Sequence, residues 1–220
     1  LPLERIFMLL FFVTSMGLLG FCDDVFKDDD HKGLRGHLSE LLRGRLTSGG
    51  LKALLGLVFS LIFAVGLRLT GEGEEIGGWW WRPLIHLPLG ALAANSLNLF
   101  DLRPGRAGKV FILASAVFLL YMGGIARRPQ PALYLLLPAL GAVLAYLPTD
   151  LGATGMMGDT GANFLGALFG GVVIMSEIPF LWIMSLVFLA LLHWYAERSS
   201  ITETIEDNPI LKFLDDLGRD

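Results

Sequence analysis

Three short polar motifs interrupt an otherwise apolar chain, and each carries side chains that could bind a cation or a phosphate. The first motif is "GFCDDVFK", in which Asp23 and Asp24 end a run of apolar residues. Adjacent carboxylates repel each other and are costly near hydrocarbon unless a cation compensates their charge. We predict a charged site at this helix end; the alternative is an ordinary solvated end, followed by a wet loop containing the aspartates at 28–30.

The second motif is "NSLNLFD", which places Asn95, Asn98 and Asp101 three residues apart. On a helix this spacing keeps all three side chains on one broad face. Two amides and a carboxylate at the end of an apolar segment are unfavourable in lipid, which indicates a site for a polar ligand. Polar packing between neighbouring helices is the alternative interpretation.

The third motif, "GMMGDTGANFLG", places Asp159 between Gly158 and Gly161, where a loop opens a helix. Glycines permit tight turns and close approach of a ligand, and the amino end of a helix favours anions such as phosphate. A carboxylate there would repel phosphate unless a metal ion lies between them, and Mg²⁺ is commonly held by one or two carboxylates together with substrate phosphates. We therefore predict that Asp159 binds Mg²⁺; a helix-capping aspartate is the alternative.

The composition around these motifs is that of a membrane protein. Of the 220 residues, 54% are hydrophobic and 17% are charged, against about 25% charged residues in soluble domains. The net charge of -4 and the lack of a long basic block argue against a nucleic-acid partner. The single cysteine, Cys22, excludes an internal disulfide and a cysteine-based zinc site.

Seven segments approach the roughly 20 apolar residues that a membrane-spanning helix needs. We therefore predict an all-α, polytopic transmembrane bundle over residues 1–196, the catalytic-type domain, and a cytoplasmic tail over residues 197–220. The predicted spans are 6–22, 51–69, 83–100, 109–126, 131–147, 161–175 and 178–196.

The distribution of basic residues predicts the orientation of these spans. Alternate loops, counted with the lysines at their borders, hold 12 of the 17 basic residues, and positive loops are cytoplasmic. The loops of this set also carry the three motifs. We therefore expect the motifs to converge on the cytoplasmic face of the plasma membrane.

In this order, the three motifs resemble those of the polyprenyl-phosphate N-acetylhexosamine-1-phosphate transferases, a membrane superfamily also described as glycosyltransferase family 4. The resemblance covers most of the chain. It implies transfer of a sugar-1-phosphate from a UDP-linked amino sugar to polyprenyl (undecaprenyl) phosphate, with Mg²⁺ as cofactor and release of UMP. A homodimer is compatible with the sequence.

The same resemblance implies roles for individual residues. Asp159 would bind the metal ion, and Asp23, with Asp24 beside it, would act as the base or orienting acid toward the lipid phosphate. Asp101 would act with them and, together with Asn98, line the site of the nucleotide diphosphate. The predicted substrate-binding residues are Lys27, Asn95, Asn98, Arg103 and Arg106.

The sequence also departs from this family. Pro104 replaces the second acid of the family's Asp-Gly-x-Asp-Gly run, and a tail, "ERSSITETIEDNPILKFLDDLGRD", stands where a histidine-rich loop is expected. The family has about ten spans, against the seven predicted here. In "LRPGRAGK", we predict that Arg103 or Arg106 neutralises donor phosphate; a positive-inside topology signal is the alternative.

Two other readings of the whole chain stay open at this point. One is a catalytically lapsed relative that binds polyprenyl phosphate or a partner. The other is a small transporter, although a transporter should place ionisable groups near the bilayer midplane rather than at helix ends.

Overall fold

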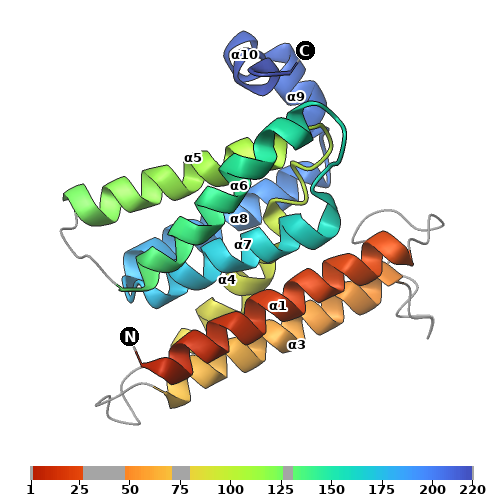
Figure 1. Ribbon diagram of the computed structural model, residues 1–220. Coiled ribbons are helices and arrows are strands. Elements are labelled where there is room, and N and C mark those ends of the chain that lie inside the picture. The colour runs from red at the N-terminus through yellow and green to blue at the C-terminus, as the bar shows by residue number, and fades with distance from the viewer. Residues whose placement is uncertain (1, 27–47, 71–79, 126–130, 220) are drawn as a thin grey trace.

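The structure, a computed structural model, describes residues 2–26, 48–70, 80–125 and 131–219, and the regular elements in these ranges are all helical (Figure 1). This confirms the predicted all-α class. The helices are α1 (Leu3–Val25), α3 (Ser48–Leu69), α4 (Arg82–Ser96), α5 (Arg106–Leu120), the π-helix η1 (Tyr121–Ile125), the 3₁₀-helix η2 (Pro131–Leu135), α6 (Leu136–Leu151), α7 (Gly158–Met175), α8 (Pro179–Ala196), α9 (Ile201–Asp207) and α10 (Pro209–Asp216).

Six of the described helices are long and apolar enough to cross a membrane, which makes the chain an integral, multi-pass membrane protein. The segment predicted as a span over residues 83–100 differs from the others. Its helix, α4, has only 15 residues, contains Pro88 and ends at Ser96. The spanning helices are Leu3–Val25, Gly49–Leu69, Arg106–Gly124, Leu133–Leu151, Gly158–Met175 and Pro179–Ala196.

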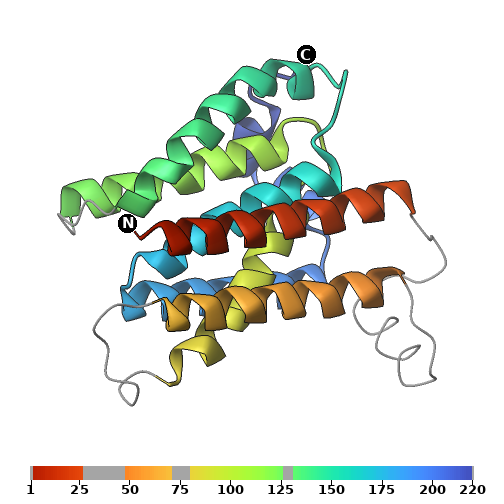
Figure 2. The same cartoon turned by 60° about the horizontal axis from the view of Figure 1, so that its bottom comes forward.

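Helix α7 lies in the middle of the bundle and is the most deeply buried of the spanning helices. The pair α1 and α3 lies on one side of it, and α5 and α6 lie on the other (Figures 1 and 2). Small residues let the backbones approach, as is usual between helices in lipid. A Cβ atom at Gly20 would lie 2.2 Å from the carbonyl oxygen of Asp159, and one at Gly166 would lie 2.3 Å from that of Ala93.

These close approaches fix α7 against α1 on one side and α4 on the other. Aromatic packing reinforces the bundle, because the rings of Phe12 in α1 and Phe63 in α3 stack with centroids 4.7 Å apart. The buried indole of Trp182 in α8 donates hydrogen bonds to the carbonyl oxygens of Val173 and Ile174 in α7, at 3.1 and 2.9 Å. The close approach of Gly20 to Asp159 thus holds the beginning of α7 against the end of α1, while Trp182 holds the end of α7 against α8.

Beyond α8, the tail folds into two short helices. The side chain of Ser200 caps α9 by accepting from the N–H of Glu203 at 3.3 Å. The side chain of Asn208 caps α10 by accepting from the N–H groups of Ile210 and Leu211 at 3.0 and 3.2 Å. These local capping signals explain why the tail forms helices with a sharp break between them.

Candidate functional site

The two adjacent aspartates and the aspartate of the glycine-rich motif meet at one end of the bundle. Asp23 and Asp24 lie in the last turn of α1, and Asp159 lies in the first turn of α7. The close packing of α1 on α7 brings these turns together. Lys27, predicted to bind substrate, and the aspartates at 28–30 lie outside the described residues.

A lysine joins two of these carboxylates. The ammonium of Lys52, in the first turns of α3, lies 2.9 Å from Oδ2 of Asp23 and also forms an ion pair with Oδ2 of Asp159. All three side chains are partly buried, with 18% of Lys52, 27% of Asp23 and 24% of Asp159 exposed. Two carboxylates held together at this depth need a compensating positive charge, and Lys52 supplies it.

From the sequence, Lys52 is only one of the basic residues that predict the topology, and this contact is not predicted. The available signal was its place at the start of a predicted span, on the same side of the membrane as the aspartates. What the pattern did not contain was the pairing of α3 with α1 and α7, which decides which acids the ammonium can reach.

Asp24 performs a different task from Asp23. Its Oδ1 accepts a hydrogen bond from the backbone N–H of Asp159 at 3.0 Å, and its Oδ2 accepts from the N–H and the hydroxyl of Thr160 at 3.0 and 2.7 Å. The side chain of the residue just before α7 forms no capping hydrogen bond. Asp24, at the end of α1, instead accepts from the free N–H groups at the beginning of α7 and so caps that helix. The amino end of α7, which we expected to favour phosphate, therefore already holds a carboxylate.

Gly158 allows this arrangement because its φ angle is +68°, in the left-handed region. A Cβ atom at this position would lie 3.0 Å from Oδ2 of Asp24. The sequence predicts that this glycine permits close approach of a ligand; in the structure it permits close approach of the Asp24 side chain.

Asp101 reaches the same helix end from a turn. Helix α4 ends at Ser96, and the N–H of Asp101 donates to the carbonyl oxygens of Leu97 and Asn98, both at 3.2 Å. The prediction that Asn95, Asn98 and Asp101 share one helix face is therefore wrong, because only Asn95 is helical. The backbone N–H of Gly158 lies near the Asp101 carboxyl and acts to lower its pKa, which places the second motif beside the third.

The surroundings of Asp101 disfavour its charged form. Burial, together with the charge of Asp150, raises the pKa of Asp101 to about 6. Asp150, near the end of α6, is completely buried, and its two carboxylate oxygens have no hydrogen-bond partner in the part of the chain that the structure describes. Asp150 is not among the predicted site residues; the signal in the sequence is a lone acid close to the end of an apolar span.

Asn95 contacts the last spanning helix. Its amide nitrogen lies 3.3 Å from Nε2 of His193 in α8, while Nδ1 of the same ring lies 2.8 Å from the carbonyl oxygen of Leu189. A carbonyl can only accept, so Nδ1 carries the proton and Nε2 accepts from Asn95. His193 thus orients the Asn95 amide.

The two arginines of the loop after Asp101, which are predicted to neutralise donor phosphate, form ion pairs with the tail in the structure. The buried guanidinium of Arg106 donates to both carboxylate oxygens of Asp215 at 2.8 Å and to the hydroxyl of Thr202 at 3.0 Å. Arg103 forms an ion pair with Glu206. The guanidinium of Arg106 is committed to α9 and α10, because those helices fold back onto the start of α5.

An apolar cavity of about 110 Å³ lies between α4, α5, α7 and α8. Leu97 and Phe100, which line it, belong to the turn that contains Asn98 and leads to Asp101. The cavity is lined further by Phe169, Phe188 and Leu192. An apolar group could therefore lie within the bundle with one end close to the turn that carries Asn98 and Asp101.

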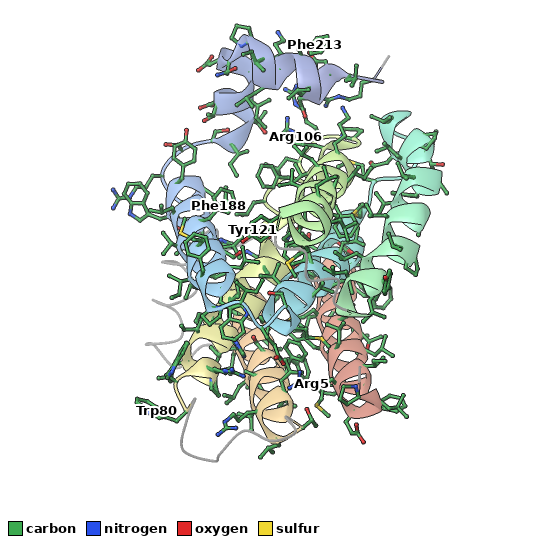
Figure 3. All side chains as sticks on the ribbon, turned by 90° about the vertical axis from the view of Figure 1, so that its left-hand side faces the viewer. Arg5, Trp80, Arg106, Tyr121, Phe188 and Phe213 are labelled. Atoms are coloured by element: carbon green, nitrogen blue, oxygen red, sulfur yellow. The ribbon has the colours of Figure 1, made fainter. Side chains whose placement is uncertain are left out.

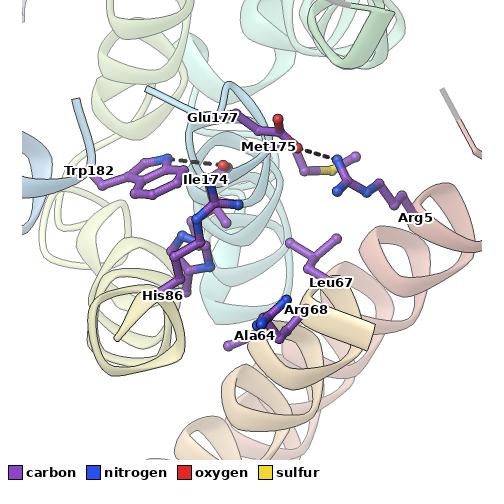
Figure 4. Close-up of a pocket in the computed structure, with 10 residues that line it drawn as sticks. Arg5, Ala64, Leu67, Arg68, His86, Ile174, Met175, Glu177 and Trp182 are labelled. Atoms are coloured by element: carbon purple, nitrogen blue, oxygen red, sulfur yellow. Dashed lines mark hydrogen bonds and ion pairs between the residues drawn. The ribbon is translucent and has the colours of Figure 1, made fainter. Parts of the chain in front are cut away.

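A second, much smaller pocket lies at the opposite end of the spanning helices. It is lined by residues from the start of α1, the end of α3 and the start of α4, including Arg5, Arg68 and Arg82 (Figure 4). Glu177 also lines it and forms an ion pair with Arg5. Among the residues that the structure describes, this pocket has no paired carboxylates, and it is not the candidate site.

The donor set at the first site fits a hard divalent cation. Asp23 and Asp159 present carboxylate oxygens to one shared positive charge, the ammonium of Lys52. Among the described residues, no three histidine, cysteine, aspartate or glutamate side chains are grouped to hold a metal ion by themselves. Mg²⁺ usually takes only one or two protein carboxylates and completes its shell with waters and substrate phosphates, so two carboxylates suffice.

Comparison with known proteins agrees with the motifs. A family model described as glycosyl transferase family 4 matches residues 6–177. The chain is 25% identical over 186 residues to the phospho-N-acetylmuramoyl-pentapeptide-transferase of Bacillus velezensis, covering 82% of this chain and 55% of that protein. The corresponding proteins of Clostridium beijerinckii and Chlamydia trachomatis are 26% and 27% identical, covering 80% and 77% of this chain and 54% and 52% of theirs. The chain thus spans about half the length of the curated relatives it matches.

Proposed function

Since the chain belongs to glycosyl transferase family 4, we propose that it carries the catalytic membrane bundle of a sugar-1-phosphate transferase. The donor would be a UDP-linked amino sugar, the acceptor a polyprenyl phosphate, and the released product UMP. The observation that carries this proposal is the meeting of Asp23, Asp159 and Lys52 at one end of the bundle. The relatives named as phospho-N-acetylmuramoyl-pentapeptide-transferases support the same reaction class.

Phosphoryl transfer depends mainly on positioning and on neutralising the phosphate charge. Asp159 and Asp23 would hold Mg²⁺, which supplies that neutralisation when it is bound. Lys52 contributes a second positive charge and keeps both carboxylates directed to one point. Asp23, with 27% of its side chain exposed, would orient the lipid phosphate or take its proton.

Asp24 and Asp101 would act beside this centre. The three hydrogen bonds of Asp24 to α7 make it a positioning residue for Asp159 rather than a base. Asp101, whose pKa burial raises to about 6, can be protonated near neutral pH and can then donate a hydrogen bond to the donor nucleotide or diphosphate. Asn98, in the same turn, would face the same ligand.

The apolar cavity suggests how the acceptor would be held. The first isoprene units of a polyprenyl chain would lie among Phe100, Phe169 and Phe188, which brings the phosphate toward Asn98 and Asp101. Such a lipid reaches the cavity from within the bilayer. The excess of basic residues on this side supports a cytoplasmic site, where UDP-sugars are available.

The orientation has its own test. A Thr154→Cys substitution in a Cys22→Ser background should react with a membrane-impermeant maleimide only from the cytoplasm, because Thr154 is exposed in the turn before α7. Labelling from outside intact cells would reverse the proposed topology.

The activity is tested by adding UDP-N-acetylglucosamine or UDP-N-acetylmuramoyl-pentapeptide to the reconstituted protein with undecaprenyl phosphate and measuring UMP release. Asp159→Asn should reduce release by about a hundredfold or more, in line with loss of a charge-stabilising group. Glu4→Gln is the control, since it also removes one carboxylate charge, but from an exposed residue in the first turn of α1, at the other end of the bundle.

Two observations favour a second candidate function, a relative that binds polyprenyl phosphate without turnover. Lys52 already forms ion pairs with both carboxylates, and Pro104 replaces an acid of the family's motif. A protein of this kind would bind undecaprenyl phosphate yet release no UMP from either donor. Mg²⁺-dependent UMP release that Asp159→Asn abolishes would exclude it.

A further inference from the structure

Helix α10 has one apolar face and one polar face. Its apolar residues are spaced three, four and seven positions after the first, which places them on one helix face: Ile210, Phe213, Leu214 and Leu217. Leu211 lies beside them. These side chains are strongly exposed, with 72% of Ile210, 67% of Phe213 and 58% of Leu217 open to the surroundings. Five exposed apolar residues on two helical turns form a surface that is unfavourable in water.

The polar face of α10 is fixed to the bundle. Asp215 is buried against Arg106 and also binds Arg219. Lys109 donates to the carbonyl oxygens of Leu214 and Asp215 at 3.2 and 2.6 Å, and its charge complements the carboxyl end of α10. Since these contacts determine the rotation of α10 about its axis, the apolar face is held away from the protein.

The placement of α10 is that of a helix lying along a membrane surface. Figures 1 and 3 show α9 and α10 to one side of the spanning helices, next to the beginning of α5. In Figure 3, viewed roughly along the spanning helices, α10 runs across the view and Phe213 lies on the side away from Arg106. The helix is thus crosswise to the spans, at the end where Asp23 and Asp159 meet.

The end of α8 indicates the depth at which the tail begins. Trp194 and Tyr195 are exposed in its last turn, and Arg198 packs over the Trp194 ring at 4.3 Å. Exposed tryptophan and tyrosine at the end of a span mark the boundary between lipid and water. Only residues 197–200 separate α8 from α9, so the tail starts at this boundary.

We propose that α10 is an interfacial helix whose apolar face, formed by Ile210, Leu211, Phe213, Leu214 and Leu217, inserts among the lipids at the aspartate end of the bundle. The occupant of this face is the bilayer itself. The charged residues of α10 and of the segment just after it sum to zero: Lys212, Asp215, Asp216 and Arg219. Insertion therefore depends on apolar burial rather than on attraction to anionic lipids.

Insertion would also restrain the candidate site. Arg106 and Lys109, in the first turn of α5, form hydrogen bonds with α10. The turn that contains Asp101 directly precedes α5 in the chain. A helix anchored in the interface therefore fixes the loop between α4 and α5 at a constant depth. This consequence is independent of which sugar, if any, the protein transfers.

The test places an environment-sensitive NBD label on the full chain in phosphatidylcholine vesicles. In a Cys22→Ser background, which removes the one native cysteine, the label is attached to Phe213→Cys or Leu217→Cys on the apolar face. Lys212→Cys, on the exposed polar flank of the same helix, is the matched control. Lipids carrying a spin label on the acyl chain should quench the first two positions at least about threefold more than the control.

Equal, weak quenching at all three positions would overturn the proposal. Strong blue-shifted emission at positions 213 and 217 that spin-labelled lipids do not quench would also overturn it, and would indicate a protein surface instead. If that emission fell as the protein was diluted in lipid, the covering surface would be a second copy of the chain. The two independent apolar positions guard against a local effect of either substitution.

Discussion

The buried pair formed by Arg106 and Asp215 offers a quantitative test of how the tail is held. Burial alone would raise the pKa of Asp215, but hydrogen bonds from Arg106 and Arg219 outweigh it and lower the pKa from 3.8 to about 2. A difference of this size corresponds to about 2 kcal/mol in favour of the docked tail. Asp215→Asn should cost at least this much, because it also leaves the Arg106 charge buried without a partner.

Hydrogen exchange followed by mass spectrometry measures this cost locally. In Asp215→Asn, amides of residues 201–216 should exchange about thirtyfold faster than in the unmodified protein, which is the factor that about 2 kcal/mol represents. Asp216→Asn is the matched control, since its side chain is 52% exposed and its ion pair with Arg219 should contribute little. The amides of α7 should be unaffected in both variants.

The same pair predicts a pH dependence. Because the folded pKa of Asp215 is below its ordinary value, the stabilisation is complete above about pH 4 and is lost as the pH falls toward about 2. Exchange in the tail, corrected for its intrinsic rate, should rise over this range and not between pH 5 and 8. Equal protection in Asp215→Asn and Asp216→Asn would refute the reasoning, and so would tail protection that survives pH 2 unchanged.

Three further predictions concern the bundle end. Lys52→Met should lower the midpoint of thermal unfolding, because it leaves the carboxylates of Asp23 and Asp159 without a compensating charge. Added Mg²⁺ should then raise the midpoint of this variant more than that of the unmodified protein. Equal Mg²⁺ effects would contradict a cation position shared by Lys52 and Mg²⁺. Gly20→Ala should lower the midpoint by several degrees because its Cβ would meet a backbone oxygen at 2.2 Å, whereas Gly141→Ala, with open space around it, should not. Because burial raises the pKa of Asp101 from 3.8 to about 6, stability should fall as the pH rises between these values, and a pH scan of the midpoint should show no such fall in Asp101→Asn.

The departures of this chain from its family find a partial explanation in the tail. The loop "LRPGRAGK" lacks the family's second acid, and its basic residues are bound by α9 and α10 instead. Asp150 places another carboxylate near Asp101 from a different helix. The surroundings of Asp101 are thus built from α6 and the tail rather than from its own loop alone.

Much of the architecture could be predicted from the sequence because lipid leaves the backbone few choices. Apolar runs of sufficient length must form helices there, and short connections between them place alternate loops on the same side. This is why the sequence predicts that Asp23, Asp101 and Asp159 lie at the same end of the bundle. The helix in the segment 83–100 is shorter than the predicted span, because α4 ends at Ser96 and the rest of the asparagine motif forms turns.

Only the tertiary structure decided the task of each charged group. Two neighbouring residues, Asp23 and Asp24, are equivalent in the sequence, yet one binds Lys52 and the other caps α7. Such roles depend on which helix ends meet and on the direction of each side chain, and no local periodicity contains that information. The sequence by itself determined where charge must gather; the contacts between α1, α3 and α7 determined which carboxylate pairs with Lys52 and which one caps α7.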